Sequence, residues 1–499
     1  MHTPQRALVV DLCQSSRIPN IAVGYLVAGL REHGFDVGVF SPFSVGARGF
    51  SRETIDTPFS HIKRRIHFSS HPAMVRVHDT LHSMWRFYDR GRPNPQVLES
   101  FHETLRENDP DVVMISAYLH HYPTVQRMAE AARQSNVPVI LGGPAFNAPN
   151  TIDAWRDLPG LAAIVGREIE FSIADIARSA INRNGLERIP GVHLPDVRSG
   201  PPASPISDLS KLPIPDYQDF PWEKYEHRIL PVMTGRGCQW GKCVFCSDVK
   251  SVNGTGPFRS RGLDGVLNEL RTLGERHGAN STFFVDIKLN SDLVVWRGLI
   301  KEYQNCLPGG EWVGVVHVDR RPDNGLTKAD LSAARKAGMV RVSCGLESGS
   351  QRLNDRMAKG TTVQHLGEFF ENAHSEGIST RATMMLGFPG EQPEDIHSTL
   401  DFLDTYGTHI DRINLSRFSL SPGTELERQL ELKPERYVGL TPLSWDHRNA
   451  QVRYRYEPSM TREYRKAKSR LLKAVHEINS QTLPSEAGWR APHFLIQML

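Results

Sequence analysis

Two runs of alternating strand and helix patterns, separated by a proline-rich stretch, constrain the fold of this chain more than any other feature. Short apolar segments alternate with segments of helical spacing over residues 1–185, and the alternation restarts at residue 229. Parallel strands need a crossover connection, usually a helix, so this pattern predicts α/β domains with parallel sheets. Residues 186–228, between the two runs, are rich in proline and turn residues and are interpreted as a linker.

The first run predicts a doubly wound α/β domain over residues 1–185. Its expected strands are five short apolar segments, at residues 7–12, 35–40, 111–116, 137–143 and 161–166. The segment 44–110 is polar and rich in His and Arg, and we interpret it as a helical insertion. Functional loops are expected at the carboxyl ends of the strands, near residues 13–20, 117–122 and 144–150.

The second run predicts a partial (β/α)6 barrel over residues 229–424. Six strand patterns alternate here with helical stretches, whereas a complete eight-stranded barrel needs about 250 residues. Active sites of such barrels lie at the carboxyl ends of the strands. Residues 425–499 are basic and aromatic, with a long helical run over 461–479, and are interpreted as a small, mainly helical C-terminal extension.

A cluster of cysteines gives the strongest local signal. Cys238, Cys243 and Cys246 have the spacing C-x4-C-x2-C, in a glycine-containing loop directly after an expected strand. Six cysteines in 499 residues do not make a disulfide scaffold. Three thiolates can hold a [4Fe–4S] cluster with one iron left open, or a zinc ion if Asp248 or a distant histidine supplies a fourth ligand. Coincidental core cysteines are the third alternative.

The loop resembles the cluster loop of radical S-adenosylmethionine (SAM) enzymes, which follows the first strand of a partial barrel. Phe245 matches the aromatic residue that precedes the last cysteine in that family. The usual spacing there is C-x3-C-x2-C, and this chain has one additional residue between Cys238 and Cys243. The resemblance implies that Cys238, Cys243 and Cys246 hold a [4Fe–4S] cluster and that Phe245 lies against the cofactors.

Later segments resemble the SAM-binding segments of the same family, in the same order along the chain. Glu347, within 342–350, occupies the position of the acidic residue that binds the SAM amino group. Gly387 lies in the segment that packs against adenine, and Arg381 on the same expected strand could pair with the SAM carboxylate. Residues 418–424 resemble the end of the sixth strand. Each residue alone also fits an ordinary role, as a strand-end carboxylate, a turn glycine or a solvated arginine.

The N-terminal domain has four segments, at residues 22–34, 111–116, 142–147 and 165–168, in which it resembles the flavodoxin-like domain of the cobalamin-binding subfamily. The resemblance implies that Gly142 and Gly143 let the backbone approach the corrinoid's nucleotide tail and that Ser116 hydrogen-bonds to it. The D-x-H-x-x-G signature that supplies a histidine to cobalt is absent, so His120 and His121 are the candidate lower ligands. A Rossmann-like partner domain without cofactor is the alternative.

Taken together, the resemblance implies a cobalamin-dependent radical SAM enzyme that methylates an unactivated carbon through a 5′-deoxyadenosyl radical and methylcobalamin. A non-methylating rearrangement, ring contraction or cyclisation is the first alternative. A non-catalytic metal- or corrinoid-binding module is the second. An external electron donor such as flavodoxin or ferredoxin is the implied partner, while the substrate, a small molecule or a peptide, and the catalytic residues stay unidentified.

Charge and hydropathy limit the partners further. The net charge of +3 argues against a nucleic-acid coat protein or a polybasic membrane binder. No apolar run approaches the roughly 18 residues that a membrane-spanning helix needs. The N-terminal segment lacks the long apolar core and the cleavage site of a signal peptide, so we expect a cytoplasmic enzyme.

Overall fold

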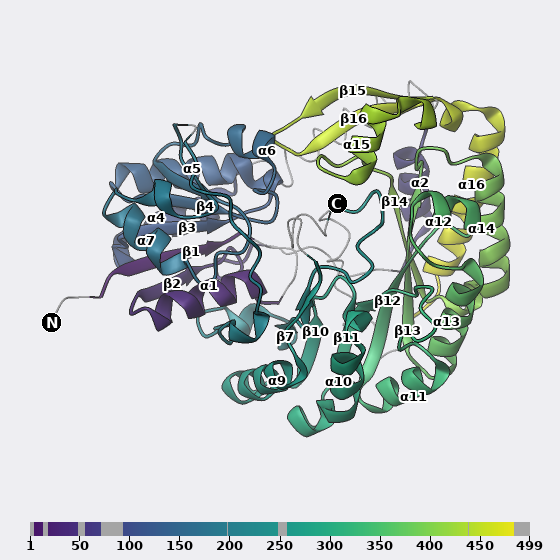
Figure 1. Ribbon diagram of the computed structural model, residues 1–499, viewed down its shortest axis with the longest axis horizontal. Coiled ribbons are helices and arrows are strands. Elements are labelled where there is room, and N and C mark those ends of the chain that lie inside the picture. The colour runs from purple at the N-terminus through teal and green to yellow at the C-terminus, as the bar shows by residue number, and fades with distance from the viewer. Residues whose placement is uncertain are drawn as a thin grey trace.

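Two parallel sheets organise the molecule, one in an N-terminal domain and one in a larger C-terminal half (Figure 1). The computed structural model describes residues 4–12, 18–47, 55–70, 93–196, 198–247, 257–437 and 439–483. Cys13 and Asp248 therefore lie outside the described residues. No helix in the described part of the chain is long and apolar enough to cross a bilayer.

The N-terminal sheet has the strand order β2-β1-β3-β4-β5-β6, in which β6 alone runs antiparallel to its neighbour. Its strands are β1 (Arg6–Asp11), β2 (Asp36–Phe40), β3 (Val112–Ser116), β4 (Val139–Gly142), β5 (Leu161–Val165) and β6 (Val192–His193). The order 2-1-3-4-5 is that of flavodoxin-like doubly wound sheets, which confirms the predicted fold of this domain. The edge strand β6 comes from the stretch interpreted as a linker.

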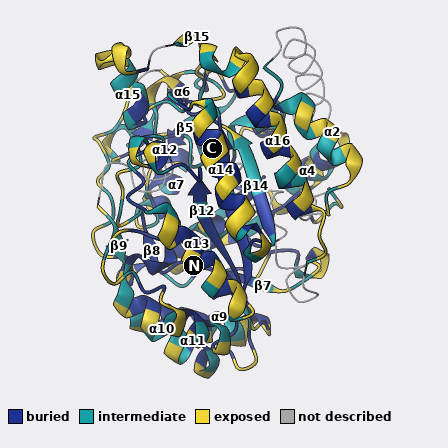
Figure 2. Ribbon diagram, turned by 90° about the vertical axis from the view of Figure 1, so that its right-hand side faces the viewer, coloured by how far each residue is buried: buried dark blue, intermediate teal, exposed yellow. Residues whose placement is uncertain are grey.

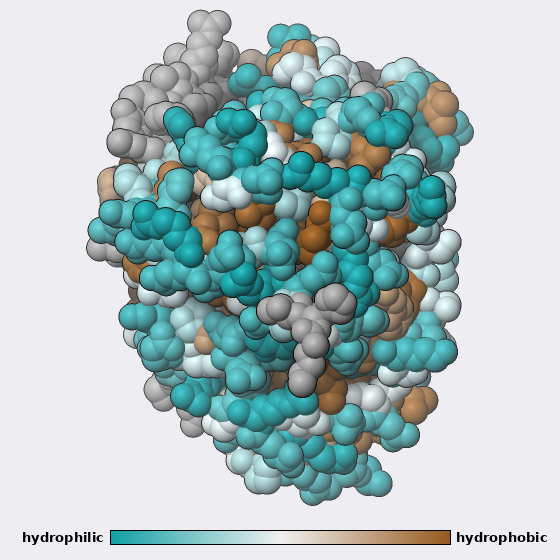
Figure 3. Space-filling model, turned by 90° about the vertical axis from the view of Figure 1, so that its left-hand side faces the viewer, coloured by the Kyte–Doolittle hydropathy of each residue, from teal (hydrophilic) through white to brown (hydrophobic). Residues whose placement is uncertain are grey.

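Helices cover both faces of this sheet because its strands are apolar on both sides. Along β1, Ala7 and Val9 are buried with α1 (Ile21–Glu32) and α7 (Ile173–Ile181), whereas Leu8 and Val10 are buried with the helices of the other face. Those helices are α4 (Pro95–Asn108), α5 (Tyr122–Gln134) and α6 (Pro149–Asp153). The outer surface of the domain is largely hydrophilic (Figure 3).

The interpretation of 44–110 as an insertion is wrong for α4. Val97, Phe101 and Leu105, four residues apart, are buried against the sheet, so α4 is the crossover helix between β2 and β3. The preceding helix α2 (Pro58–His67) does depart from the domain: the Asp56 N–H donates to the Asn479 carbonyl oxygen at 2.9 Å, beside the C-terminal helix.

The C-terminal half contains six parallel strands in the order β14-β13-β12-β11-β10-β7, with β7 and β14 at the two edges. The strands are β7 (Ile229–Val232), β10 (Ser281–Phe284), β11 (Trp312–Val316), β12 (Met339–Glu347), β13 (Ser379–Leu386) and β14 (Arg412–Arg417). The covering helices are α9 (Leu263–His277), α10 (Leu293–Cys306), α11 (Lys328–Lys336), α12 (Gln351–Arg356), α13 (Val363–Ser375) and α14 (Pro393–Tyr406). The predicted partial barrel is confirmed, and its strands are buried beneath amphipathic helices (Figure 2).

Two short strands, β8 (Gly235–Arg236) and β9 (Arg259–Ser260), form an antiparallel pair apart from the barrel sheet. The C-terminal extension contains α15 (Glu425–Leu432), the hairpin of β15 (Leu440–Asp446) and β16 (Gln451–Tyr456), and α16 (Arg462–Asn479). The predicted helical extension is confirmed, and the hairpin is an addition that the sequence pattern did not predict.

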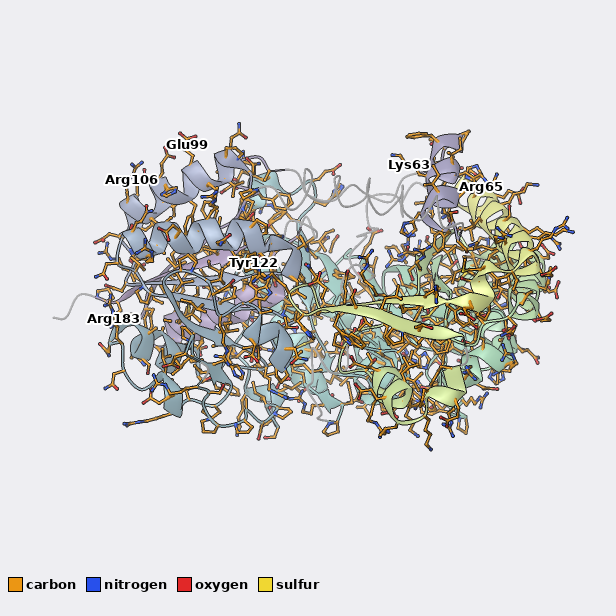
Figure 4. All side chains as sticks on the ribbon, turned by 90° about the horizontal axis from the view of Figure 1, so that it is seen from above. Lys63, Arg65, Glu99, Arg106, Tyr122 and Arg183 are labelled. Carbon is orange, nitrogen blue, oxygen red and sulfur yellow. The ribbon has the colours of Figure 1, made fainter. Side chains whose placement is uncertain are left out.

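The β15–β16 hairpin spans from the barrel to the N-terminal domain (Figures 1 and 4). Arg448, in its turn, donates hydrogen bonds to the Ala154 carbonyl oxygen at 3.1 Å and to the Asp157 carboxylate at 2.9 Å. Its guanidinium lies 4.1 Å from the ring centroid of Tyr122, and its carbonyl oxygen accepts from the Trp155 indole N–H at 3.0 Å. The extension thus joins the two domains.

Candidate active site

The loop that carries the three cysteines begins at the carboxyl end of β7, where a buried carboxylate holds it. Asp286, which follows β10, accepts hydrogen bonds from the Thr234 N–H at 3.1 Å, the Thr234 hydroxyl at 2.7 Å and the Gly235 N–H at 3.0 Å. Burial raises the pKa of Asp286 to about 6. The pairing of β8 with β9 then closes the base of the loop.

Cys238, Cys243 and Cys246 are half-buried on this loop. Burial raises the pKa of the Cys243 thiol to about 11, so this group must lose its proton when it binds iron. No three His, Cys, Asp or Glu side chains of the described residues are placed to hold one metal ion. Zinc needs its ligands at about 2.0–2.3 Å from one ion, whereas cluster thiolates bind separate irons and so lie farther apart. Three thiols on one loop are a ligand set for a [4Fe–4S] cluster, which leaves one iron to another ligand.

Packing brings the cysteine loop against the segments that follow β13 and β14. The Phe245 ring lies edge-on to Phe388, with centroids 6.3 Å apart. Val244 is buried in the same apolar cluster as Phe388 and Phe418. The Val244 N–H also donates to the Met357 carbonyl oxygen at 3.0 Å. The carboxyl ends of these strands therefore form one site with the loop.

Glu347 ends β12 with a left-handed backbone, at φ 58°, and its side chain is buried. Its Oε1 accepts a hydrogen bond from Lys359 Nζ at 3.0 Å. Although burial alone would lower the pKa of Lys359, the charge of Glu347 raises it. A Cβ at Gly345 would lie 2.4 Å from Glu347 Oε1, so only glycine leaves room for this pair. The Trp240 indole N–H, in the cysteine loop, donates to the Ala358 carbonyl oxygen at 2.8 Å, so the residue before Lys359 contacts that loop.

Gly387 follows β13 with φ 87°, and among the described residues no atom lies within 4 Å of the place where its Cβ would stand. Its N–H donates to Glu391 Oε2 at 2.7 Å, and the Tyr464 hydroxyl hydrogen-bonds to the same carboxylate. The turn is therefore held firmly while the space beside Gly387 is open.

These groups fit a [4Fe–4S] cluster with bound SAM. Thiols supply ligands for iron, a buried carboxylate can accept hydrogen bonds from an ammonium group, and open backbone admits a planar ring. All of them lie at the carboxyl ends of parallel strands, the expected place for a barrel active site.

Arg381 is not brought to this site. It lies near the amino end of β13, in register with Ser343, whereas Met384 is the β13 residue in register with Glu347. Its Nε donates to Ser343 Oγ at 3.0 Å, and the side chain is 3% exposed. Three residue-to-residue steps of about 3.3 Å along the strand separate Arg381 from the level of Glu347. The geometry therefore supports neither the predicted pairing with the SAM carboxylate nor the alternative of a solvated arginine.

Sequence reasoning missed a buried ion pair beside the cysteine loop. Lys288, after β10, forms a hydrogen-bonded ion pair with Asp319, after β11, and both side chains are fully buried. Lys288 Nζ also donates to Gln239 Oε1, in the cysteine loop, at 3.4 Å. Burial lowers the pKa of Lys288. The available signal was a charged residue directly after each of two apolar strands, where barrel function resides.

In the N-terminal domain, Ser116 ends β3 in register with Gly142 of β4. A Cβ at Gly143 would lie 2.1 Å from the Ala117 carbonyl oxygen, so contact between the strand ends itself explains this glycine. His121 is buried, and its Nδ1 accepts a hydrogen bond from the Tyr118 N–H at 3.2 Å.

The His120 ring lies next to that of His121, with centroids 4.0 Å apart and the two planes tilted by 58°. Both histidines and the ends of β3 and β4 therefore lie together at the carboxyl edge of the sheet, where doubly wound domains bind their ligands. This edge fits the place of a corrinoid tail.

Outside the site, the remaining described cysteines, Cys306 and Cys344, are buried within α10 and β12. Tyr456, which ends β16 in the C-terminal extension, is also buried, and its hydroxyl donates to the Glu391 carbonyl oxygen at 3.1 Å.

Comparison with known proteins agrees with this geometry. The radical SAM superfamily model matches residues 232–403, and the B12 binding domain model matches residues 72–170. The chain therefore belongs to the radical SAM enzymes that carry a B12-binding domain, and it is a cobalamin-dependent radical SAM enzyme. Its cofactors are a [4Fe–4S] cluster, SAM and cobalamin.

The chain is also similar in sequence to individual relatives. The chain is 28% identical over 337 residues to an uncharacterized methyltransferase of Pyrococcus horikoshii, covering 64% of this chain and 70% of that protein. It is 26% identical over 360 residues to the anaerobic magnesium-protoporphyrin IX monomethyl ester cyclase of Rubrivivax gelatinosus, covering 67% of this chain and 62% of the cyclase.

Solved structures share the fold. The radical SAM methyltransferase TsrM of Kitasatospora setae, with cobalamin and a [4Fe–4S] cluster bound, has a TM-score of 0.63 at 14% identity and covers 97% of this chain and 90% of its own. OxsB, with aqua-cobalamin and SAM bound, has a TM-score of 0.64 at 16% identity and covers 94% and 66%.

Proposed function

We propose that this enzyme transfers a methyl group from SAM, by way of cobalamin, to an unactivated carbon atom of its substrate. The observation that carries the proposal is the joining of a B12-binding domain to a radical SAM domain with an intact cysteine triplet at the carboxyl end of β7. The methyltransferase names of the Pyrococcus relative and of TsrM support it.

We assign residues of the barrel to the cluster and SAM. Cys238, Cys243 and Cys246 would each bind one iron and leave the fourth iron to SAM. Glu347 would accept a hydrogen bond from the SAM amino group, because its buried carboxylate lies at the end of β12 beside the cysteine loop. The open backbone at Gly387 would lie along the adenine, with Phe245 packed behind that segment.

We assign the corrinoid to the carboxyl edge of the N-terminal sheet, against Ser116, Gly142 and Gly143. The proposed domain boundaries are 1–185 for the cobalamin-binding domain, 186–228 for the linker, 229–424 for the barrel and 425–499 for the extension.

The bound cofactors would supply a 5′-deoxyadenosyl radical and a transferable methyl group. One methylation then uses two SAM molecules and two electrons. The substrate hydrogen ends on 5′-deoxyadenosine, the methyl group on the substrate carbon, and methionine and S-adenosylhomocysteine leave. An external donor such as flavodoxin or ferredoxin would supply the electrons. The described cysteines form no disulfide with one another, which suits a reducing compartment, so we place the reaction in the cytoplasm.

The test is made anaerobically on protein with reconstituted cluster, hydroxocobalamin, SAM and a strong reductant. Methyl transfer predicts 5′-deoxyadenosine together with S-adenosylhomocysteine, and the second product must require cobalamin. Formation of 5′-deoxyadenosine alone, with candidate substrates present, would contradict methyl transfer.

Ring formation is a second candidate, favoured by the similarity to the Rubrivivax cyclase. A cyclisation breaks substrate bonds through the same radical but adds no methyl group. Mass spectrometry of the product therefore separates the candidates, because only methylation adds the mass of one CH2 unit.

A further inference from the structure

The base of the cysteine loop carries three arginines, two of them buried and one half-buried, that contact the N-terminal domain. Arg236 is in β8, Arg259 begins β9 and Arg261 follows it, so they flank the loop on both sides in sequence. Their exposed fractions are small, at 6% for Arg236 and 3% for Arg261. Long cationic side chains are rarely buried unless they are paired.

Acidic residues of the N-terminal domain pair with the first two arginines. Glu168, three residues after β5, accepts two hydrogen bonds of 2.6 Å from the guanidinium nitrogens of Arg259 and lies 3.6 Å from Arg236 NH1. Glu170 forms a hydrogen-bonded ion pair with Arg236. Both carboxylates have side chains no more than 10% exposed. The charge of these arginines lowers the pKa of Glu168, although burial opposes it.

The third arginine, Arg261, contacts the N-terminal domain through the aromatic side chain of Tyr25. Arg261 NH1 donates to the Tyr25 hydroxyl, on α1, at 2.6 Å and also pairs with Glu269 of α9. The Tyr25 ring lies between two guanidinium groups, 5.9 Å from Arg236 and 5.6 Å from Arg261. One ring therefore contacts both sides of the loop base.

The position of this network indicates a role beyond holding the two domains together. Glu168 and Glu170 follow β5 at the carboxyl edge of the N-terminal sheet, the edge to which we assign the corrinoid. The arginines stand where the cysteine loop leaves and re-enters the barrel. A bidentate arginine–carboxylate pair fixes both distance and angle, which a hydrophobic contact does not.

We infer that Glu168 and Glu170 are positioning residues that fix the cluster-bearing loop relative to the cobalamin-binding domain. This inference rests on the proposed function, because it takes the loop to hold the cluster. Methyl transfer needs both domains in register, whereas cleavage of SAM to 5′-deoxyadenosine needs only the barrel. A reacting group displaced by about 1 Å can lose on the order of 100-fold in rate.

The test compares the loaded full-length enzyme with Glu168→Gln, Glu170→Gln and Arg259→Lys. Glu130→Gln is the matched control, because Glu130 pairs with Arg133 on the exposed face of the same domain. Glu168→Gln should reduce cobalamin-dependent S-adenosylhomocysteine formation by about tenfold or more while 5′-deoxyadenosine stays within about twofold. Arg259→Lys keeps the positive charge but loses the two-pronged guanidinium contact. Its rate of S-adenosylhomocysteine formation should therefore lie between those of the wild type and Glu168→Gln.

A second readout does not depend on turnover. In protein loaded with Co(II) cobalamin and a reduced cluster, the magnetic coupling between the two centres should change in Glu168→Gln and not in Glu130→Gln. Hydrogen exchange at residues 235–236 and 259–261 should quicken.

The inference would be overturned if Glu168→Gln kept the wild-type magnetic coupling and the wild-type hydrogen exchange. It would also be overturned if this variant, at full iron content, lost 5′-deoxyadenosine and S-adenosylhomocysteine formation to the same extent. Glu170→Gln decides the matter if Glu168→Gln does not fold. If the wild-type enzyme forms no S-adenosylhomocysteine, the proposed methyl transfer fails, while coupling and exchange still test the positioning role.

Discussion

Replacement of Gly387 by alanine separates backbone strain from loss of the SAM site. At φ 87° an L-residue pays about 1–2 kcal/mol, which lowers the melting temperature of a domain of this size by a few degrees. No described atom lies within 4 Å of the new methyl group, so the substitution adds no clash in the protein itself. The methyl group would instead occupy the space that we assign to adenine.

We therefore expect Gly387→Ala to weaken SAM binding by about tenfold, or 1.4 kcal/mol, with unchanged iron content. Gly309 is the matched control: its φ is 67°, no described atom lies within 4 Å of its Cβ position, and it stands in the exposed turn between α10 and β11. Gly309→Ala should lose the same stability and keep wild-type affinity. Calorimetric titration of the cluster-loaded protein with SAM measures the affinity of each variant. Equal affinities for Gly387→Ala and Gly309→Ala would refute the assignment of Gly387.

Three further predictions follow from buried charges and from the hairpin. Lys288→Met leaves Asp319 with Arg321 as its remaining ionic partner and should destabilise the chain by about 1.5–3 kcal/mol in urea unfolding, the cost of one charged hydrogen bond. The same substitution should cost less when Asp319 is already Asn, and an equal cost in both backgrounds would contradict the pairing. Burial raises the pKa of Glu391 to about 7 from 4.5, so the folded chain holds a proton that the unfolded chain releases between those pH values. Wild-type stability should therefore fall relative to Glu391→Gln as the pH rises across that window, and a constant difference would exclude the shift. Arg448→Ala should quicken hydrogen exchange across the hairpin at 440–456 with no change in iron content, and exchange at the wild-type rate would show that the contact with the N-terminal domain does not hold the hairpin.

The fold was largely readable because its signals are local. Strand β1 alternates between two helix layers, and its apolar run is typical of a strand buried on both faces. The cysteine triplet and the strand-end position of Glu347 are also local in sequence. Their convergence depends only on the rule that parallel strands end at one edge.

What could not be predicted depends on register and on distant partners. The sequence pattern predicts the strand that carries Arg381, but the height of this residue along the strand follows from its register with Ser343, which no local pattern shows. In α4, Val97, Phe101 and Leu105 follow the spacing of an amphipathic helix. The surrounding residues are rich in His and Arg, however, so the segment as a whole is typical of a polar insertion. The ion pair of Arg259 with Glu168 joins residues 91 positions apart and leaves no trace in spacing.

The central claim is that Cys238, Cys243 and Cys246 hold a four-iron cluster with SAM at its open iron. The most direct measurement is electron paramagnetic resonance of the reduced, anaerobically reconstituted protein, with and without SAM, beside iron and zinc analysis of wild type and Cys243→Ala. The account predicts about four irons per chain in the wild type, a spectrum that changes when SAM is added, and loss of both properties in Cys243→Ala. A protein that contains zinc alone and shows no response to SAM would contradict it.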